Sequence, residues 1–145
     1  MEAILHFDGG IRKGTMAYGW ILLNPNDETE VIASGNKTCG THSSTSNIAE
    51  YRALIAGING CLKNKVNIVH IYGDSLLIIN QVIGVFKTNK PELKKHRDYV
   101  LKLLEKFENY TIKWVPRREN KRADALVNAV FQNKCPKKQR KSQRR

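Results

Sequence analysis

The sequence predicts an α/β domain built on a five-stranded mixed sheet with helices packed against it. Three β-type segments joined by short turns come first, a fourth lies between helical segments, and a fifth precedes a final helix. Short turns join antiparallel strands, whereas a strand–helix–strand crossover makes neighbouring strands parallel. The predicted order is β-β-β-α-β-α-α-β-α, without an internal repeat or a second domain.

The first three strands are predicted at residues 2–8, 16–23 and 30–38. Gly9-Gly10 is expected to end the first strand, and Asn24-Pro25-Asn26-Asp27 is typical of a turn after the second. Because the connections are short, these strands are expected to form an antiparallel meander.

The central part of the chain alternates between helical and β-type patterns. Residues 47–62 are predicted to be helical because apolar side chains recur there at helical spacing. Residues 66–72 form a nearly continuous β-branched run, which predicts a strand buried on both faces. Residues 75–83 are predicted to form a helix that stops at Gly84.

The last three elements are a helix, a strand and a helix. Residues 91–107 repeat apolar positions with charges on the other face, residues 110–115 form a strand stopped by Pro116, and residues 120–131 form the final helix. Trp20 and Trp114 lie on predicted strands and are expected to pack in the core.

The composition excludes several classes of protein. Of 145 residues, 41 % are hydrophobic and 26 % charged, which is typical of a globular domain. No apolar stretch approaches the ~18 residues of a membrane-spanning helix, and Met1-Glu2-Ala3 lacks the basic start of a signal peptide. Cys39, Cys61 and Cys135 form no CxxC pair, which excludes a disulfide framework and disfavours zinc. We expect a monomer in the reducing cytoplasm, without membrane contact.

The net charge of +12 predicts a polyanionic partner, first of all nucleic acid. Seven of the last twelve residues are basic, yet the rest of the chain still carries a net +5. We therefore divide the chain into a domain at residues 1–132 and a basic, disordered tail at 133–145. The tail could contact phosphates non-specifically, act as a nuclear-import signal in a eukaryote, or only aid solubility.

Four acidic residues stand at the ends of predicted elements. Asp8 and Asp74 end apolar strands, Glu50 lies in the first turn of the first helix, and Asp124 lies early in the final helix. If the strands that end at Asp8 and Asp74 are parallel neighbours, both side chains project from one edge of the sheet, where α/β proteins bind ligands. The helix starts that hold Glu50 and Asp124 can reach the same edge.

Three of these acids also have purely structural interpretations. Asn47 and Glu50 fit a capping box, Asp74 is a plausible helix N-cap, and Asp124 could complement a helix dipole. A strand end gains little from a carboxylate, so Asp8 is harder to explain in this way.

Gathered at one edge, four carboxylates would repel one another unless a cation bound between them. Oxygen-only ligands favour Mg²⁺ or Mn²⁺ over zinc. Two such ions within a basic surface are suited to phosphodiester cleavage, one activating water and the other stabilising the leaving 3′ oxygen, while Lys and Arg hold the phosphate backbone.

Four motifs resemble those of ribonuclease H, type 1, in the same order and across nearly the whole chain. They are Phe7-Asp8-Gly9-Gly10, Thr45-Ser46-Asn47-Ile48-Ala49-Glu50-Tyr51, Tyr72-Gly73-Asp74-Ser75, and the segment from Trp114 to Leu126 that contains Pro116-Arg117-Arg118 and Asn120. The absence of a basic protrusion makes the chain more similar to the short archaeal-type members.

The resemblance implies a ribonuclease H-like fold and endonucleolytic hydrolysis of the RNA strand of an RNA–DNA hybrid, giving 5′-phosphate and 3′-hydroxyl products. Asp8, Glu50, Asp74 and Asp124 would hold two Mg²⁺, with Mn²⁺ as a substitute. The residues expected to contact the substrate are Gly9, Gly10, Thr45, Ser46, Asn47, Arg118 and Asn120.

The sequence also departs from the family pattern. Many members carry a His in the loop before the last acid. No His lies between Trp114 and Asp124 here, so Arg117 is expected to act in its place, with Arg118 as the rival. Leu76 stands where a Gln often follows the Asp-Ser pair, and Ser46 occupies the middle of the Thr-Asn-Asn motif.

Three other functions are alternatives to this one. A nucleic-acid-binding module that has lost catalysis would lack one of the four acids. A transposase, integrase or Holliday-junction resolvase core would space its acids differently. The chain could also be the ribonuclease H part of a reverse transcriptase polyprotein, although the Met1 start and the tail favour a free-standing protein.

Overall fold

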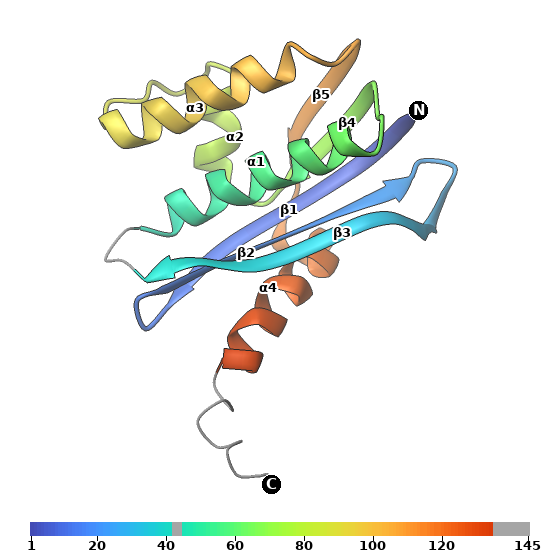
Figure 1. Cartoon of the computed structure of the whole chain (residues 1–145). Helices are drawn as coiled ribbons and strands as arrows, with labels where there is room; N and C mark the ends of the chain where they lie inside the picture. The colour runs from blue at the N-terminus through green and yellow to red at the C-terminus, as the bar shows by residue number, and fades with distance from the viewer. Residues whose placement is uncertain (42–44, 135–145) are drawn as a thin grey trace, which may run out of the picture.

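The sheet of the computed structural model, which describes residues 1–41 and 45–134, has the strand order β3-β2-β1-β4-β5 (Figure 1). The strands are β1 Glu2–Arg12, β2 Thr15–Asn24, β3 Asp27–Thr41, β4 Ile68–Gly73 and β5 Asn109–Trp114. The helices are α1 Ser46–Lys63, α2 Leu76–Val82, α3 Pro91–Leu104 and α4 Lys121–Lys134, and the short 3₁₀ helix η1 spans Arg117–Glu119.

The pairing of the strands confirms the predicted mixed sheet. β1 pairs antiparallel with β2 and β2 antiparallel with β3, whereas β1 pairs parallel with β4 and β4 parallel with β5. The parallel register places Phe7 opposite Gly73. The next residues along the two strands, Asp8 and Asp74, therefore leave the same end of neighbouring strands.

Alternate side chains of β1 pack on opposite faces of the sheet. Leu5 and Phe7 belong to the large core that α1 covers, while Ile4 packs on the other face beside Leu126 of α4. Helices α1 and α4 thus lie on opposite faces, and both cross β1 and β2 (Figure 1). This arrangement brings the start of each helix near Asp8 on β1.

β1 continues past Gly9-Gly10 to Arg12, so the prediction that these glycines end the strand is wrong. Gly9 pairs with Tyr18 and Gly10 with Ala17, so the ladder with β2 stays intact. The reversal comes later, in a tight turn in which Lys13 and Gly14 have φ values of 50° and 78°. A neighbouring strand that supplies hydrogen bonds outweighs the low strand propensity of glycine.

Two burial predictions were also wrong. β4 is fully buried at alternate positions only, with His70 and Tyr72 half-buried on the second face, because α4 lies over β1 and β2 rather than over β4. Trp114 is 45 % exposed at the end of the edge strand β5. Trp20 packs against the main core, as predicted.

The helix ends differ from prediction by a few residues. α3 ends at Leu104 rather than 107, and α4 runs from Lys121 to Lys134, so that residues 133 and 134 belong to the helix and not to the tail. Residues 135–145, which hold the rest of the predicted tail, lie outside the described residues. In the part of the chain that is described, no helix is both long and apolar enough to cross a membrane.

Candidate metal centre and nucleic-acid interface

Four elements bring the predicted acids to one place. Asp8 lies on β1 at the level where β4 ends, Asp74 directly follows β4, Glu50 is in the second turn of α1, and Asp124 is in the first turn of α4. One oxygen from each of Asp8, Glu50 and Asp74 lies within 4.8 Å of the other two. Asp124 adjoins this trio through a hydrogen bond with Asp8. All four carboxylates therefore converge, as the sequence predicted.

Glu50 is positioned by a backbone contact rather than by a helix cap. Its Oε1 accepts a hydrogen bond from the Gly9 backbone amide at 3.1 Å. α1 starts after Thr45, whose side chain makes no capping hydrogen bond within the described residues. The capping-box interpretation of Asn47 and Glu50 is therefore wrong, and Glu50 points towards Gly9 within β1.

Asp74 likewise does not cap the helix that follows it. Ser75 is the N-cap of α2, and its side chain accepts a hydrogen bond from the Ile78 amide. Asp74 Oδ2 is buried and has no hydrogen-bond partner among the described residues. Burying a carboxylate oxygen without a hydrogen-bond partner costs free energy. The position of this atom therefore favours binding of a ligand from outside the chain.

The packing of the acids shifts their protonation. Burial, the neighbouring charge of Asp74 and the hydrogen bond with Asp124 together raise the pKa of Asp8 to about 8. Burial and the charges of Asp8 and Asp74 raise the pKa of Glu50 well above its ordinary value. Burial also raises the pKa of Asp74, against the opposing effects of Asn120 and Arg117. The site resists the accumulation of negative charge unless a cation enters it.

These observations fit a divalent cation. The donor set is made of carboxylate oxygens alone, three of them close enough to share one ion, and one oxygen of Asp74 lacks any other partner. Hard cations such as Mg²⁺ and Mn²⁺ prefer such oxygen ligands. A bound ion would also lower the raised pKa values by supplying the missing positive charge.

Asp124 is more exposed than Asp8 and Glu50, which are both buried. Its Oδ1 lies 4.0 Å from Arg117 Nη2, and its Oδ2 accepts a hydrogen bond from Asn128 Nδ2 at 3.3 Å. The side chain of Asp124 is 31 % exposed and that of Arg117 is 81 % exposed. The charge of Arg117 offsets part of the rise in the pKa of Glu50 and of Asp74, so its guanidinium acts on these two acids as well as contacting Asp124. Arg118 is exposed, and no contact between it and the acids is found among the described residues.

Asn120, predicted to contact substrate, is buried, with only 1 % of its surface exposed. Its Nδ2 donates to the Phe7 carbonyl at 2.9 Å, its Oδ1 lies 3.2 Å from His6 Nδ1, and its side chain also hydrogen-bonds Asp74. Asn120 therefore ties β1 to Asp74 and is not available to a ligand from solution. The prediction failed because a loop position gave no sign of burial.

His6 stands behind the acids as part of the same network. Its ring stacks on Tyr72, with 5.4 Å between the ring centroids, and burial lowers its pKa despite the hydrogen bond with Asn120. His6 lies inside a predicted strand, a position that favours a core or supporting role over a catalytic one, and its contacts in the structure fit that role.

The remaining residues predicted to contact substrate lie next to Asp8 on β1 and within two turns of Glu50 at the start of α1. Thr45 and Ser46 are exposed and Asn47 half-exposed at the start of α1, one turn before Glu50. Gly9 has no room for a side chain, since a Cβ would lie 2.4 Å from the Ala49 carbonyl group. The glycine is thus required by the packing of β1 on α1, a reason that the sequence did not indicate.

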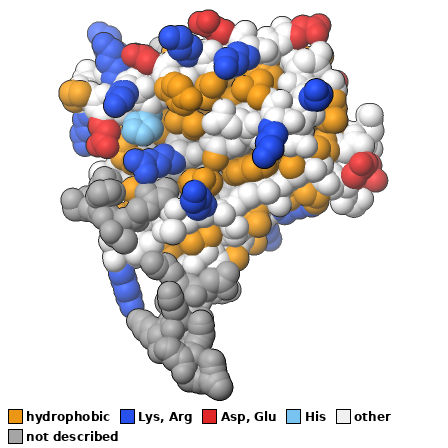
Figure 2. Space-filling view, viewed as in Figure 1, with side chains coloured by type: hydrophobic (Ala, Val, Ile, Leu, Met, Phe, Trp, Pro, Cys, Tyr) orange, Lys and Arg blue, Asp and Glu red, His pale blue; other side chains and the backbone are white. Residues whose placement is uncertain are grey.

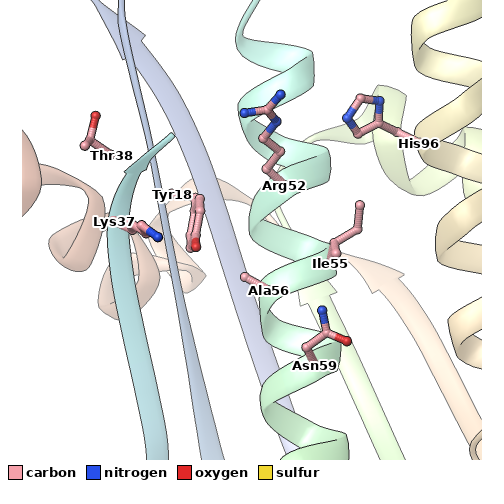
Figure 3. A pocket seen from close by; sticks show the side chains of 8 residues that line it. All are labelled: Tyr18, Lys37, Thr38, Arg52, Ile55, Ala56, Asn59 and His96. Atoms are coloured by element: carbon pink, nitrogen blue, oxygen red, sulfur yellow. The ribbon is translucent and has the colours of Figure 1, made fainter. Parts of the chain in front are cut away.

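A groove beside α1 lies next to the acids rather than over them. It has a volume of about 480 Å³ and lies over the outer side of α1, between β3 and α3 (Figure 3). Figure 3 shows His96 reaching from α3 towards α1, with Lys37 and Thr38 on β3 at the opposite side and Arg52 on α1 between them. None of the four carboxylates lines it.

The face of the molecule that carries this groove is basic. Figure 2 shows Lys and Arg side chains spread over it among apolar patches, with most acidic side chains near its rim. Such a surface attracts phosphate groups.

Comparisons with known proteins agree with this arrangement. Residues 6–130 match the sequence family described as reverse transcriptase-like. The chain is 38 % identical over 128 residues to ribonuclease HI of Halobacterium salinarum, a match that covers 87 % of this chain and 62 % of that protein. It is 33 % identical over 130 residues to a bifunctional protein of Mycobacterium tuberculosis, of which it spans only 35 %.

Solved structures show the same fold. The ribonuclease H1 of Halobacterium salinarum superposes with a TM-score of 0.86 at 34 % identity, covering 92 % of this chain and 99 % of that one. LC11-RNase H1, solved in complex with an RNA/DNA hybrid, superposes with a TM-score of 0.82 at 27 % identity and the same coverage. With its matching sequence family, its fold and its converging acids, the chain belongs to the ribonuclease H family, type 1, within the sequences described as reverse transcriptase-like.

Proposed function

We propose that this protein is an endonuclease that hydrolyses the RNA strand of RNA–DNA hybrids with two divalent metal ions, leaving 5′-phosphate and 3′-hydroxyl ends. The observation that carries the proposal is the convergence of Asp8, Glu50 and Asp74 within 4.8 Å, beside Asp124, in a chain of net charge +12. The ions would be Mg²⁺, with Mn²⁺ able to substitute. The relatives named for ribonuclease H activity support the same substrate.

The four carboxylates would hold the ions, and the raised pKa of Asp8 supports this role because a cation removes the cost of its ionisation. When bound, the ions would activate water and stabilise the leaving 3′ oxygen. Gly9 keeps Glu50 aimed at the site through its amide, and Asn120 holds the Asp74 carboxylate from the buried side. These contacts fix the ligand oxygens before a substrate arrives, which lowers the reorganisation needed for reaction.

Selection of RNA would rest on the 2′-hydroxyl group, which DNA lacks. Asn47 and Glu50 occupy successive turns at the start of α1, so a strand that reaches the ions would pass both side chains. Asn47 would hydrogen-bond in the minor groove and Glu50 would contact a 2′-hydroxyl while binding metal. Thr45, exposed at the start of α1, would bind a phosphate of the DNA strand.

Positive charge around the site would hold the duplex backbone. Arg117 lies 4.0 Å from Asp124 and would serve where many relatives carry a His, with Arg118 confined to phosphate contact. Lys37 and Arg52 beside the groove would contact phosphates farther along the duplex. The rest of the predicted basic tail, residues 135–145, would add non-specific contacts of the same kind.

A nucleic-acid-binding module without catalysis is a second candidate function, but the convergence of all four acids argues against it. A binding module has no need for a buried carboxylate oxygen that lacks a partner, such as Asp74 Oδ2.

The decisive experiment compares cleavage of an RNA–DNA hybrid, duplex DNA, duplex RNA and single strands in Mg²⁺, Mn²⁺ and EDTA. We expect cleavage of the hybrid alone, only with metal, and with 5′-phosphate ends on the RNA fragments. Asp8→Asn should lose the activity while still binding the hybrid. Cleavage that persists in EDTA, or equal activity of Asp8→Asn, would contradict the two-metal proposal.

A further inference from the structure

Asp124 is the one predicted metal ligand that lies outside the close trio, and a chain of side chains leads away from it along α4. Asn128, one helical turn after Asp124, donates from Nδ2 to Asp124 Oδ2 at 3.3 Å. Its Oδ1 accepts a hydrogen bond from Arg12 Nη2 at 2.7 Å. Arg12, at the end of β1, stacks its guanidinium over the ring of Phe131 at 4.7 Å from the centroid.

We propose that Asn128, held in place by Arg12, is a positioning residue that orients the Asp124 carboxylate for metal binding. The inference rests on the proposed function, because it assumes that Asp124 binds metal. It concerns two residues that belong to none of the motifs identified in the sequence.

The chemistry of an amide suits this position. A residue at position 128 must donate a hydrogen bond to the Asp124 carboxylate and accept one from the Arg12 guanidinium. A side-chain amide can do both. Arg12 is fixed in turn by Phe131, whose buried ring provides a rigid platform. Arg12 therefore fixes the direction in which Asn128 presents its NH₂ group, as outer residues around metal sites orient the ligands themselves.

The opposing contacts of Asp124 explain why orientation matters. Its Oδ1 faces Arg117 at 4.0 Å and its Oδ2 faces Asn128, so the two neighbours set the rotation of the carboxylate plane. Because the side chain is 31 % exposed, packing alone does not hold it. Without Asn128, Oδ2 of Asp124 would lose the hydrogen bond that fixes it on this side, and binding the metal would have to order the carboxylate more fully.

The test is a calorimetric titration of the full chain with Mn²⁺ in the absence of nucleic acid. Asn128→Leu keeps the size of the side chain, favours the helix and removes both hydrogen bonds. Gln132→Leu makes the same kind of change one turn further along α4, where the residue is exposed, and serves as the matched control. We expect the dissociation constant for Mn²⁺ to rise roughly tenfold in Asn128→Leu, a common effect of losing a residue that orients a metal ligand. It should stay unchanged in Gln132→Leu.

Arg12 is tested in two backgrounds. Arg12→Met should weaken Mn²⁺ binding in the wild-type chain but add nothing in the Asn128→Leu chain, because Arg12 acts through Asn128. If Arg12→Met instead tightened Mn²⁺ binding, Arg12 would act only as a nearby positive charge, and the proposed chain would be wrong. An equal loss in both backgrounds would also overturn it.

Activity supplies a second measurement. The Mg²⁺ concentration for half-maximal cleavage should rise in Asn128→Leu, while kcat at saturating Mg²⁺ and KM for the hybrid should stay close to the wild-type values. If the wild-type chain binds Mn²⁺ and Asn128→Leu binds it equally well, only the positioning role is refuted. If the wild-type chain shows no Mn²⁺ binding that Asp8→Asn weakens, the proposed function fails as well.

Discussion

The backbone amide of Gly9 donates a hydrogen bond to Oε1 of Glu50, and the space between their two elements leaves no room for a side chain on Gly9. A Cβ at position 9 would lie 2.4 Å from the carbonyl carbon and oxygen of Ala49 and 2.6 Å from the Glu50 nitrogen. Contacts of this length with backbone atoms cannot be relieved by a rotamer change. The strand that carries Asp8 and the helix that carries Glu50 thus touch at their backbones.

Gly9→Ala should therefore separate β1 from α1 and move two metal ligands apart. We expect a loss of about 2–4 kcal/mol in the free energy of unfolding, measured in urea, together with a strong loss of activity. Gly10→Ala is the matched control, because its Cβ would meet only Phe131 and Val127 side chains at 3.9 Å. Equal stability of the two variants would contradict the close approach.

Asp8→Asn should make the metal-free protein more stable while abolishing cleavage. The carboxyl of Asp8 is only 5 % exposed and lies beside Asp74 and Asp124, so an amide of the same size removes a buried charge from an acidic cluster. We expect a gain on the order of 1–3 kcal/mol at pH 8 in EDTA, measured by urea unfolding. Mn²⁺ should stabilise the wild-type protein but have little effect on the variant.

The stability of the metal-free protein should fall as the pH rises. The pKa of Asp8 is about 8 in the folded protein against an ordinary value of 3.8, so the folded state holds a proton that the unfolded state has lost between these values. The stabilisation that comes from holding this proton is fully present below about pH 4 and is lost as the pH rises through 8. Over this range the free energy of unfolding falls by up to about 1.4 kcal/mol per pH unit.

Urea unfolding in EDTA at pH 5.5, 7 and 8.5 measures this slope. Glu50 and Asp74, whose pKa values are also raised, should act in the same direction. Asp8→Asn should flatten the dependence, and saturating Mn²⁺ should also remove most of it, because the metal displaces the protons and the folded and unfolded states are then both ionised over this range. A wild-type stability that rises over this range in EDTA would show that the acids are ionised without a cation.

Asn120→Ala should reduce stability and kcat rather than substrate affinity. The change leaves the Phe7 carbonyl and one ring nitrogen of His6 without their partner in a buried region, at a cost of about 1–3 kcal/mol. It also frees the Asp74 carboxylate, so kcat should fall while KM for the hybrid changes little. Arg118→Ala is the contrasting variant, exposed on the same loop, and should raise KM without loss of stability. If Asn120→Ala raised KM and left kcat and stability unchanged, the result would instead support the sequence prediction that Asn120 contacts the substrate.

Lys37→Ala should weaken binding of the hybrid without affecting the chemical step. Lys37 is exposed at the edge of the groove beside α1, where a phosphate contact would add to affinity independently of base sequence. KM should rise, and the slope of log affinity against log salt should decrease by roughly one. Lys63→Ala, at the last turn of α1 and so at the opposite end of the helix from Glu50, removes the same charge and should leave both quantities nearly unchanged.

The sequence alone determined the order of the elements and the edge of the sheet at which the acids meet. Apolar side chains recur every two residues in strands and every three to four in helices, and this spacing depends on local backbone geometry. The strands and α-helices of the described residues could therefore be predicted within a few residues of their ends. Once Asp8 and Asp74 were placed at the ends of neighbouring parallel strands, the rule for ligand sites in α/β sheets predicted their meeting.

Only the tertiary structure decided which polar side chains face the site and which support it from behind. Asn120 and His6 are 114 positions apart in sequence, and the burial of their contact depends on how the loop before α4 packs against β1. Trp114 is exposed for a related reason, since β5 has a neighbouring strand on one side only. Burial is set by what lies across the fold from a residue, and no local pattern in the chain records it.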